Sequence, residues 1–517
     1  MKTSPDWILA IGGSEHDLSA ALARGCDIRV AIEQERLSRR KHGMAHWYES
    51  PVTRSIEYCL ADQDIDLRQV TRAVSSDSVP ARIHRDLCGL ELRQFPHHLC
   101  HAAAAAMMLP ADSRAGILVY DGYGSIRGPA PESPLRNLRE TFSFYTFAPE
   151  GYRCLGSTFG LAYIEQDEFP IGVTNSIGML YELVTGLLGY DLMDSGKTMG
   201  LSSYGVPRYL DVLERFVRFG DSPSSCFYCA SDDPDLTSIV GGILRNGRGS
   251  FAVRADLAAS TQMLVHKTLL HCLQFFRELP LDYLCISGGC GLNTVANGFL
   301  VQHGSLEVPL LIPPHCGDAG LGLGALWLDQ LDELGVSPTF TFNGDPVGPA
   351  LSRPGRRYSL HERREAVLEF YPKLVFDSSV VSPDDLARVL ARGEIIGLFN
   401  GRSENGNPRD CNGSSSDIDR TRMPVAAGAL LLSHADERVS CISGDCPLTE
   451  GATVGRRWSR GALGVVHRLL CFLPSRSRRL SGPTRSHSMG RLWNHPPHPA
   501  VVGIRFGIFA ISSPDAV

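Results

Sequence analysis

Lysine is scarce in this chain of 517 residues, and long hydrophobic runs are missing. Only five of the 50 basic residues are lysines. The longest apolar runs, such as residues 425–432, are far shorter than the roughly 20 residues needed to span a membrane. The apolar residues 7–11 end at two glycines, which does not predict a signal peptide. With 43% hydrophobic and 21% charged residues, the composition predicts a globular protein of two or three domains without a membrane partner.

Tyrosine is absent from residues 407–517, although the whole chain has 15. This stretch contains 14 arginines, no lysine and eight acidic residues, so it carries 14 − 8 = +6, which leaves −12 for residues 1–406. An acidic body argues against nucleic-acid binding. The basic stretch predicts either a flexible tail or the translation of a once-folded domain in another reading frame. The 15 cysteines follow no regular spacing and predict reduced thiols, so we expect a cytoplasmic protein.

Four strand-like apolar runs end in glycine-rich turns, at residues 8–13, 116–122, 283–289 and 310–320. Such turns let a backbone approach a phosphate group closely. Strand-like and helical patterns alternate over the first 335 residues, which predicts an α/β fold. The four junctions together predict a nucleotide cleft between two related halves.

A histidine pair is the strongest sign of a metal site. His97 and His101 come just before a run of five alanines, Ala102–Ala106, which strongly favours a helix. Because the two histidines are four residues apart, their side chains share one face of that helix. Such a pair either binds a metal ion or is simply structural. Asp318, in a glycine-rich loop, is the best candidate for a third ligand. Two histidines and one carboxylate suit Fe(II) or Zn(II) with open coordination positions.

Three further residues are candidates for chemistry. His16 follows the first strand and could accept a proton from a hydroxyl group, with Asp17 fixing its tautomer. The alternative is that Asp17 or Ser19 only caps a helix at residues 18–23. Lys41 and Lys197 could each neutralise a phosphate or carbonyl oxygen, although a basic cluster such as residues 39–41 can equally be a solvated face.

Several of these motifs, in this order, resemble the O-carbamoyltransferases of the nodulation and antibiotic-biosynthesis type. The resemblance covers roughly residues 7–406. The motifs that carry it are Gly12–Leu22, Glu33–Gly43, His97–Ala103, Asp121–Gly124, Gly196–Gly205, Gly288–Asn293 and Cys316–Gly324.

The resemblance implies a two-lobed domain of the sugar-kinase/actin superfamily and an enzyme that uses ATP and carbamoyl phosphate. It implies that His97, His101 and Asp318 bind iron, Fe(II) or another divalent metal, and that His16 activates the acceptor hydroxyl. Lys41 is expected to contact the intermediate or the acceptor. The residues expected to bind nucleotide or carbamoyl-adenylate are Asp121, Gly122, Gly124, Lys197, Gly288, Gly289, Asn293, Gly317 and Arg402.

The family's second domain is YrdC-like and makes the carbamoyl-adenylate. Residues 401–406 match its entry signature, but the match ends at Asn407, so only Arg402 carries over. We therefore expect a transferase domain at residues 1–339, a linker at 340–357, the start of a YrdC-like domain at 358–406 and an aberrant tail at 407–517.

The expected activity is carbamoyl transfer to a hydroxyl of a sugar-like or secondary-metabolite acceptor, by a protein that could be a homodimer. Two alternatives are a catalytically impaired remnant that still binds metal and nucleotide, and a kinase or ATPase with the same superfamily fold.

Overall fold

The computed structural model describes residues 6–348, apart from residues 15, 39, 44–52, 86, 88, 131–132, 167–168 and 192, and scattered residues up to Cys441. Residues 1–356 with 402–411 form one compact unit, and the remaining residues form a second. The fold and site below belong to the first unit. Ten of the described cysteines, between Cys26 and Cys316, are free thiols. Among the described residues, no helix combines the length and hydrophobicity needed to cross a membrane.

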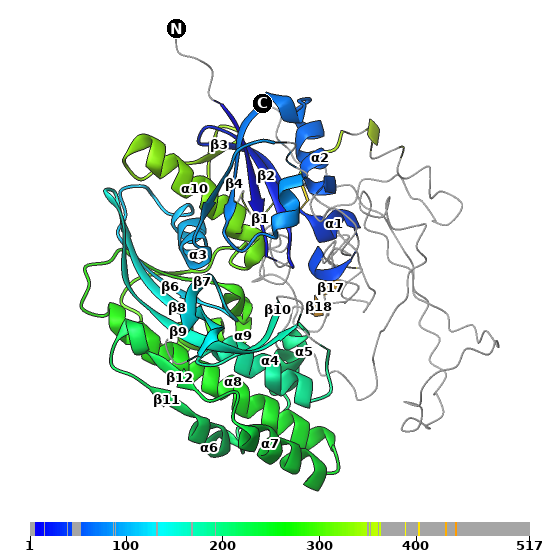
Figure 1. Ribbon diagram of the computed structural model, residues 1–517, viewed down its shortest axis with the longest axis vertical. Helices are drawn as coiled ribbons and strands as arrows, with labels where there is room; N and C mark the ends of the chain where they lie inside the picture. Colours follow the sequence, from blue (N-terminus) through cyan, green and yellow to red (C-terminus); the bar gives the residue numbers. More distant parts are fainter. Residues whose placement is uncertain are drawn as a thin grey trace, which may run out of the picture. The chain divides into compact units, whose positions relative to one another are not determined.

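The first half of this unit is built on one sheet (Figure 1). Its five main strands are β1 (Trp7–Gly12), β2 (Ser19–Arg24), β3 (Asp27–Glu33), β4 (Val70–Ser76) and β5 (Leu92–Phe95). Their order across the sheet is β3-β2-β1-β4-β5. Strands β1, β2 and β3 pair antiparallel in succession, whereas β4 and β5 continue parallel to β1. Two short helices, α1 (Gln34–Ser38) and α2 (Thr53–Asp62), follow β3.

The second half repeats this arrangement. Its equivalent strands are β6 (Ala115–Tyr120), β8 (Ser133–Ala148), β9 (Gly151–Gln166), β13 (Tyr283–Ser287) and β14 (Leu310–Leu311). Their order is β9-β8-β6-β13-β14, again with two antiparallel pairings followed by two parallel ones. Strand β10 (Phe169–Val173) extends the sheet beyond β9, and β7 (Ile126–Ala130) pairs with β8. The two related α/β halves predicted from the sequence are therefore confirmed.

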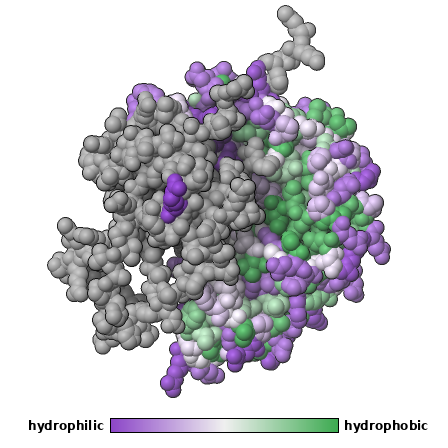
Figure 2. Space-filling view, turned by 180° about the vertical axis from the view of Figure 1, so that it is seen from behind, coloured by the Kyte–Doolittle hydropathy of each residue, from purple (hydrophilic) through white to green (hydrophobic). Residues whose placement is uncertain are grey.

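Additional helices pack on the second sheet, in the lower part of Figure 1. They are α4 (Ile177–Leu187), α5 (Ser195–Ser202), α6 (Leu210–Leu213), α7 (Pro234–Asn246), α8 (Phe251–Leu273) and α9 (Thr294–His303). A short hairpin, β11 (Val217–Phe219) with β12 (Phe227–Cys229), lies in the same insertion. Seen from behind, apolar side chains gather in the middle of the described surface and polar ones along its outer edge (Figure 2).

Helices α3 (His97–Ala106) and α10 (Leu321–Leu334) cross at very short range. All ten residues of α3 are buried. A Cβ at Gly324 of α10 would lie 1.8 Å from the carbonyl oxygen of Cys100, so only glycine allows this approach. The alanine run thus forms the predicted helix, and its small side chains let it pack tightly in the core.

Two expectations need correction. Residues 19–24 form strand β2 rather than part of a helix, because their alanines pair with β1 on one side and β3 on the other. The stretch expected to be a linker contributes β15 (Thr341–Phe342), which pairs parallel with β3, and β16 (Asp345–Pro346). Phe340, Phe342 and Leu351 are buried there. The predicted YrdC-like start and the basic tail lie almost wholly outside the described residues. Of the tail, the structure describes strands β17 (Leu430–Leu431) and β18 (Ser440–Cys441), which pair antiparallel.

Candidate metal centre

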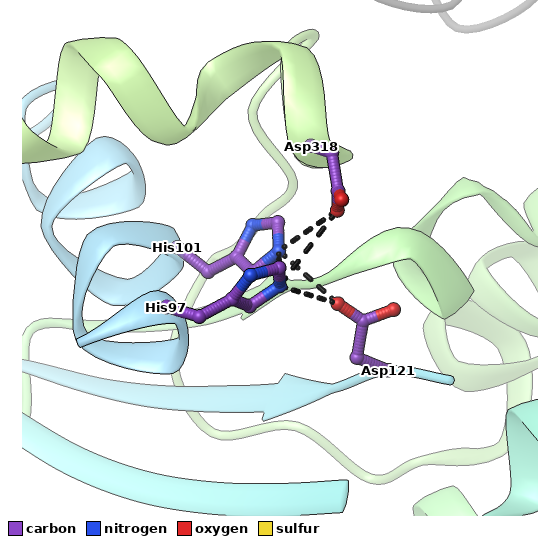
Figure 3. A group of neighbouring side chains, drawn as sticks. All are labelled: His97, His101, Asp121 and Asp318. Atoms are coloured by element: carbon purple, nitrogen blue, oxygen red, sulfur yellow. Dashed lines mark hydrogen bonds and ion pairs between the residues drawn. The ribbon is translucent and has the colours of Figure 1, made fainter. Parts of the chain in front are cut away.

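Four buried side chains from three segments of the chain converge on one point (Figure 3). His97 and His101 lie one turn apart on α3, Asp121 directly follows β6, and Asp318 precedes α10. One ligand atom from each residue lies within 4.8 Å of the others. Helix α3, the end of strand β6 and the turn before α10 therefore bring these groups together.

The distances between these atoms suit a bound cation. The Nε2 atoms of His97 and His101 are 3.1 Å apart, and each lies 3.1–3.2 Å from Oδ2 of Asp121. Oδ1 of Asp318 lies 3.8 Å from His97 Nε2 and 3.4 Å from His101 Nε2. Ligands about 2.1 Å from one ion are separated by roughly 3.0–3.4 Å in octahedral or tetrahedral geometry. Among the described residues, no lysine or arginine forms an ion pair with either carboxylate.

Hydrogen bonds from outside the cluster fix the orientation of these groups. Nδ1 of His97 lies 2.8 Å from the hydroxyl of Ser78, which leaves its Nε2 toward the centre. Ser14 donates a 2.6 Å hydrogen bond to Oδ2 of Asp318. Oδ1 of Asp121 accepts backbone hydrogen bonds from Gly122 and Gly289, so its Oδ2 faces the histidines. Supporting contacts of this kind are typical of metal ligands.

Two opposing effects set the pKa values in the cluster: burial disfavours the charged form of each group, and the oppositely charged neighbours favour it. Burial alone would lower the pKa of His101, but hydrogen bonds with Asp121 and Asp318 raise it to about 9. Burial alone would raise the pKa of Asp121, but hydrogen bonds with His101 and His97 hold it well below its usual range. The two carboxylates therefore stay ionised and available to bind a cation.

His16, the predicted base, lies beside this cluster. Its Nε2 is 4.0 Å from Oδ2 of Asp318, and its Nδ1 is 3.1 Å from Oδ2 of Asp17. Burial alone would lower the pKa of His16, but the hydrogen bond with Asp17 and the nearby carboxylates raise it to about 9. Since β2 replaces the expected helix, Asp17 has no helix to cap here, and its carboxylate orients His16 instead.

Lys41 and Lys197 both contact the carboxylate of Asp194, a residue that the sequence analysis did not single out. Lys41 Nζ lies 3.7 Å from Oδ1 of Asp194, and Lys197 donates to Oδ2 of the same residue. Lys41 comes from the first half, whereas Asp194 and Lys197 come from the second. Both lysine side chains remain partly exposed. The pair brings one net positive charge to the region between the halves.

The predicted glycines differ in how strictly the backbone requires them. Gly288 has a φ of 97°, and a Cβ there would lie 2.3 Å from the carbonyl oxygen of Tyr120. A Cβ at Gly289 would lie 2.9 Å from Oδ1 of Asp121, and one at Gly124 would lie 2.6 Å from the ring of His98. Gly122 and Gly317 have only ordinary or slightly tight neighbours. The turn after β13 is therefore shaped around Asp121.

Two predicted residues have structural partners of their own. The side-chain amide of Asn293 exchanges two 3.0 Å hydrogen bonds with Gln262, and its Oδ1 also caps α9. Arg402 donates to the carbonyl oxygen of Gly355 and lies over the ring of Phe342. The contacts of neither residue include the four-residue cluster.

The sequence assigned Asp121 to nucleotide binding, and the structure brings it into the cluster as a fourth candidate ligand. An aspartate at the end of a strand can bind either a nucleotide or a metal ion, so the sequence could not distinguish between these two roles for Asp121. Ser14 and Ser78, which orient the ligands, were not singled out. Ser14 could have been found, because it lies two residues before His16 in the same turn.

Comparison with known proteins agrees with the motifs. Residues 83–326 match the family described as the carbamoyltransferase N-terminus. The chain is 27% identical to the uncharacterized protein sll1178 of Synechocystis sp. over 79% of this chain and 70% of that protein. It is 27% identical to nodulation protein NolNO of Sinorhizobium fredii, over 76% of this chain and 56% of NolNO. The resemblance inferred from the sequence is thereby confirmed.

A named enzyme and a solved structure are also similar. The 3'-hydroxymethylcephem-O-carbamoyltransferase of Amycolatopsis lactamdurans is 28% identical over 41% of this chain and 39% of that enzyme. The crystal structure of full-length HypF in its phosphate- and nucleotide-bound form matches with a TM-score of 0.42 and 14% identity, over 64% of this chain and 57% of HypF. The chain thus spans little more than half of several of the proteins it matches.

Proposed function

Since residues 83–326 are a carbamoyltransferase N-terminal domain, we propose that this unit transfers a carbamoyl group from carbamoyl-adenylate to a hydroxyl of a small acceptor. The single observation that carries the proposal is the position of His16, with Nε2 4.0 Å from a carboxylate of the four-residue cluster. A candidate base and a candidate metal site lie side by side, as activation of a hydroxyl beside a polarised carbonyl requires.

The proposed reaction is an acyl-type substitution. The acceptor oxygen attacks the carbamoyl carbon, and its proton passes to Nε2 of His16, which must be neutral to accept it. A bound cation would favour this neutral form, because it would offset the charge of Asp318 and Asp121 that helps to raise the pKa of His16. The bond between that carbon and the phosphate oxygen breaks, and AMP leaves with the bonding electron pair. Asp17 stabilises the imidazolium that forms, because its ionised carboxylate lies 3.1 Å from Nδ1 of His16.

His97, His101, Asp121 and Asp318 fit a divalent metal ion, for which we propose Fe(II). When bound, the ion would supply positive charge that polarises the carbamoyl carbonyl or the adenylate phosphate. The chain's own residues hold the site in shape: Ser78 fixes the ring of His97, and Ser14 fixes the carboxylate of Asp318.

The lysines and glycine turns account for binding of an anionic donor. Lys41 and Lys197 together exceed the charge of Asp194, which leaves one net positive charge at this contact to attract a phosphate. The backbone amides of Gly122 and Gly289 already point at Asp121. Gly124, Gly288 and Gly317 complete the proposed nucleotide side of the cleft, while Asn293 contributes by shaping the start of α9.

The test uses the full chain, loaded anaerobically with Fe(II), and synthetic carbamoyl-adenylate with a panel of sugar-like alcohols. We expect AMP release that depends on the alcohol, together with an alcohol product that is heavier by one carbamoyl group. His16→Asn should retain the metal but lose roughly a hundredfold in AMP release. Phosphorylation of the alcohol by ATP with Mg(II) alone would contradict the proposal and favour a kinase.

A separate assay addresses the first half-reaction. Pyrophosphate release from ATP and carbamoyl phosphate would show that the chain also makes the adenylate. Release of AMP from supplied adenylate without this pyrophosphate would restrict the activity to the unit that contains the two sheets.

A further inference from the structure

We propose that His42 is a positioning residue, which holds Asp17 in the one orientation that aims His16 at the metal centre. The inference rests on the proposed function only in taking His16 as the base. His42 lies in the short turn Lys41–Gly43, 25 residues from Asp17 in the chain, and neither the motifs nor the comparisons assign it a role.

One carboxylate joins two imidazole rings. Oδ1 of Asp17 lies 2.9 Å from Nδ1 of His42, and Oδ2 of Asp17 lies 3.1 Å from Nδ1 of His16. The ring centroids of the two histidines are 6.4 Å apart and nearly perpendicular. Since an ionised carboxylate can only accept hydrogen bonds, both rings must donate their Nδ1–H to it. His16 is then left with its Nε2 toward Asp318, which is the atom that the proposed reaction uses.

The backbone shows that this pairing is specific. Asp17 has a φ of 53° and His42 a φ of 62°, so two residues with side chains adopt the left-handed conformation opposite each other. The amide of Asp17 donates to the carbonyl oxygen of His42, and the amide of His42 donates to Oε2 of Glu35. Strained conformations of this kind persist where the surrounding contacts require them, and they concentrate at functional sites.

The other ring nitrogen of His42, Nε2, makes no polar contact within the described part of the chain that would suggest a second role for the side chain. Nε2 of His42 is buried without a hydrogen-bond partner among the described residues. The side chain is 23% exposed. Among the residues that the structure describes, the ring therefore makes one polar contact, the one to Asp17. The same turn also presents Lys41 to Asp194, so it sets the positions of both the lysine and the base.

The experiment compares two substitutions that separate the ring from the backbone. His42→Gly relaxes the left-handed backbone but removes the donor. His42→Asn tolerates the left-handed conformation and keeps an N–H donor near the position of Nδ1. A purely conformational role would therefore make the glycine variant at least as good as the wild type.

The first readout needs no substrate. The Nδ1 proton of His16, hydrogen-bonded to Asp17, gives a downfield imidazole signal in the proton NMR spectrum of the metal-free protein, assigned by its loss in His16→Asn. We expect the signal to remain in His42→Asn and to disappear in His42→Gly. A signal that is unchanged in His42→Gly would overturn the inference. His42→Ala, which also lacks a side-chain donor, provides the same comparison if the glycine variant does not fold.

The second readout is AMP release from carbamoyl-adenylate. We expect about a tenfold decrease in kcat for His42→Gly, with most of it recovered in His42→Asn and with an unchanged metal content in both. In an Asp17→Asn background the glycine substitution should have no further effect, because His42 acts through Asp17. An additive loss would contradict the inference. Failure of the wild type to release AMP would count against the proposed function, whereas the NMR signal would still test His42.

Discussion

The two halves of the described unit share one strand order but place different chemistry after the first strand. In the first half, β1 leads into a turn with His16 and Asp17 before the chain returns as β2. In the second half, β6 leads into Asp121 and Gly122 before the chain returns through β7 and β8. One topological position thus presents a candidate base in one half and a candidate metal ligand in the other. The comparison teaches that the duplicated fold supplies the positions, whereas the local residues determine the chemistry.

The halves also differ in what has been added to them. Between β10 and β13 the second half carries a long insertion with α4, α5 and α8 among its helices. This insertion supplies Asp194 and Lys197, which meet Lys41 of the first half. The first half contributes the base, the paired histidines and Lys41, and the second contributes Asp121 and Lys197.

We expect the largest effects, on metal content and on AMP release, when the aspartate in the turn after β1 or after β6 is replaced by asparagine. Asp121→Asn removes a charged member of the four-residue cluster, so we expect loss of bound Fe(II) and about a thousandfold lower AMP release. Asp17→Asn should keep the metal and lose activity, because the partners of its carboxylate within the described part of the chain are His16 and His42, which lie outside the cluster. Metal analysis of both purified variants checks this. Equal metal loss in the two variants would show that the turns do not have separate roles.

A smaller effect is expected from the glycines at the same two turns. Gly13 has a φ of 106°, and a Cβ there would lie 2.7 Å from Cα of Leu18. At Gly122 a Cβ would meet only Met179 Sδ at 3.5 Å. Gly13→Ala should therefore lower the free energy of unfolding by about 2–4 kcal/mol. Gly122→Ala should change it by less than about 0.5 kcal/mol. Urea denaturation measures both, and similar values for the pair would refute the assignment of strain to the first turn.

We expect the smallest effect from a change of pH, which should alter the melting temperature of the metal-free protein through one histidine in each of two places, His16 and His101. His16 and His101 both have a pKa of about 9 in the folded protein and an ordinary value of 6.5 when unfolded. Their contribution to stability is therefore complete below pH 6.5 and is lost as the pH rises to 9. The metal-free protein should melt several degrees lower at pH 9 than at pH 6.5.

Two comparisons sharpen this pH prediction. Bound metal should reverse the trend, because metal ligands bind in their deprotonated form. His16→Asn should remove only part of the pH dependence and so separate the first-half contribution from that of α3. A melting temperature of the metal-free protein that is constant between pH 6.5 and 9 would exclude the proposed charge arrangement.

Much of the site could be predicted because its signals are local. The four-residue spacing of His97 and His101 needs only a helix, and the alanine run indicates one. Asp318 and His16 stand in glycine-rich turns after strand-like runs. The family resemblance predicted that His16 activates the acceptor hydroxyl, and the structure places its Nε2 4.0 Å from Oδ2 of Asp318.

The remaining features depend on contacts between distant segments. The alanines of β2 have a high helix propensity, but pairing with two neighbouring strands overrides it. Asp121 joins the cluster only because β6 and α3 lie side by side in the fold. The contacts of Asn293 with Gln262 and of Lys41 with Asp194 connect segments 31 and 153 residues apart, which no local pattern reveals.

The tight crossing of α3 and α10 has a further consequence for metal affinity. His97 and His101 belong to one helix, and Asp318 immediately precedes the other, so the backbone contact at Gly324 fixes the spacing of three ligand groups. Their side chains already lie close to ligand distances, and serines already orient His97 and Asp318. Binding an ion therefore costs little conformational entropy, and such preorganisation favours high affinity. The cost of stripping water from the ion then becomes the main factor that distinguishes one divalent metal from another.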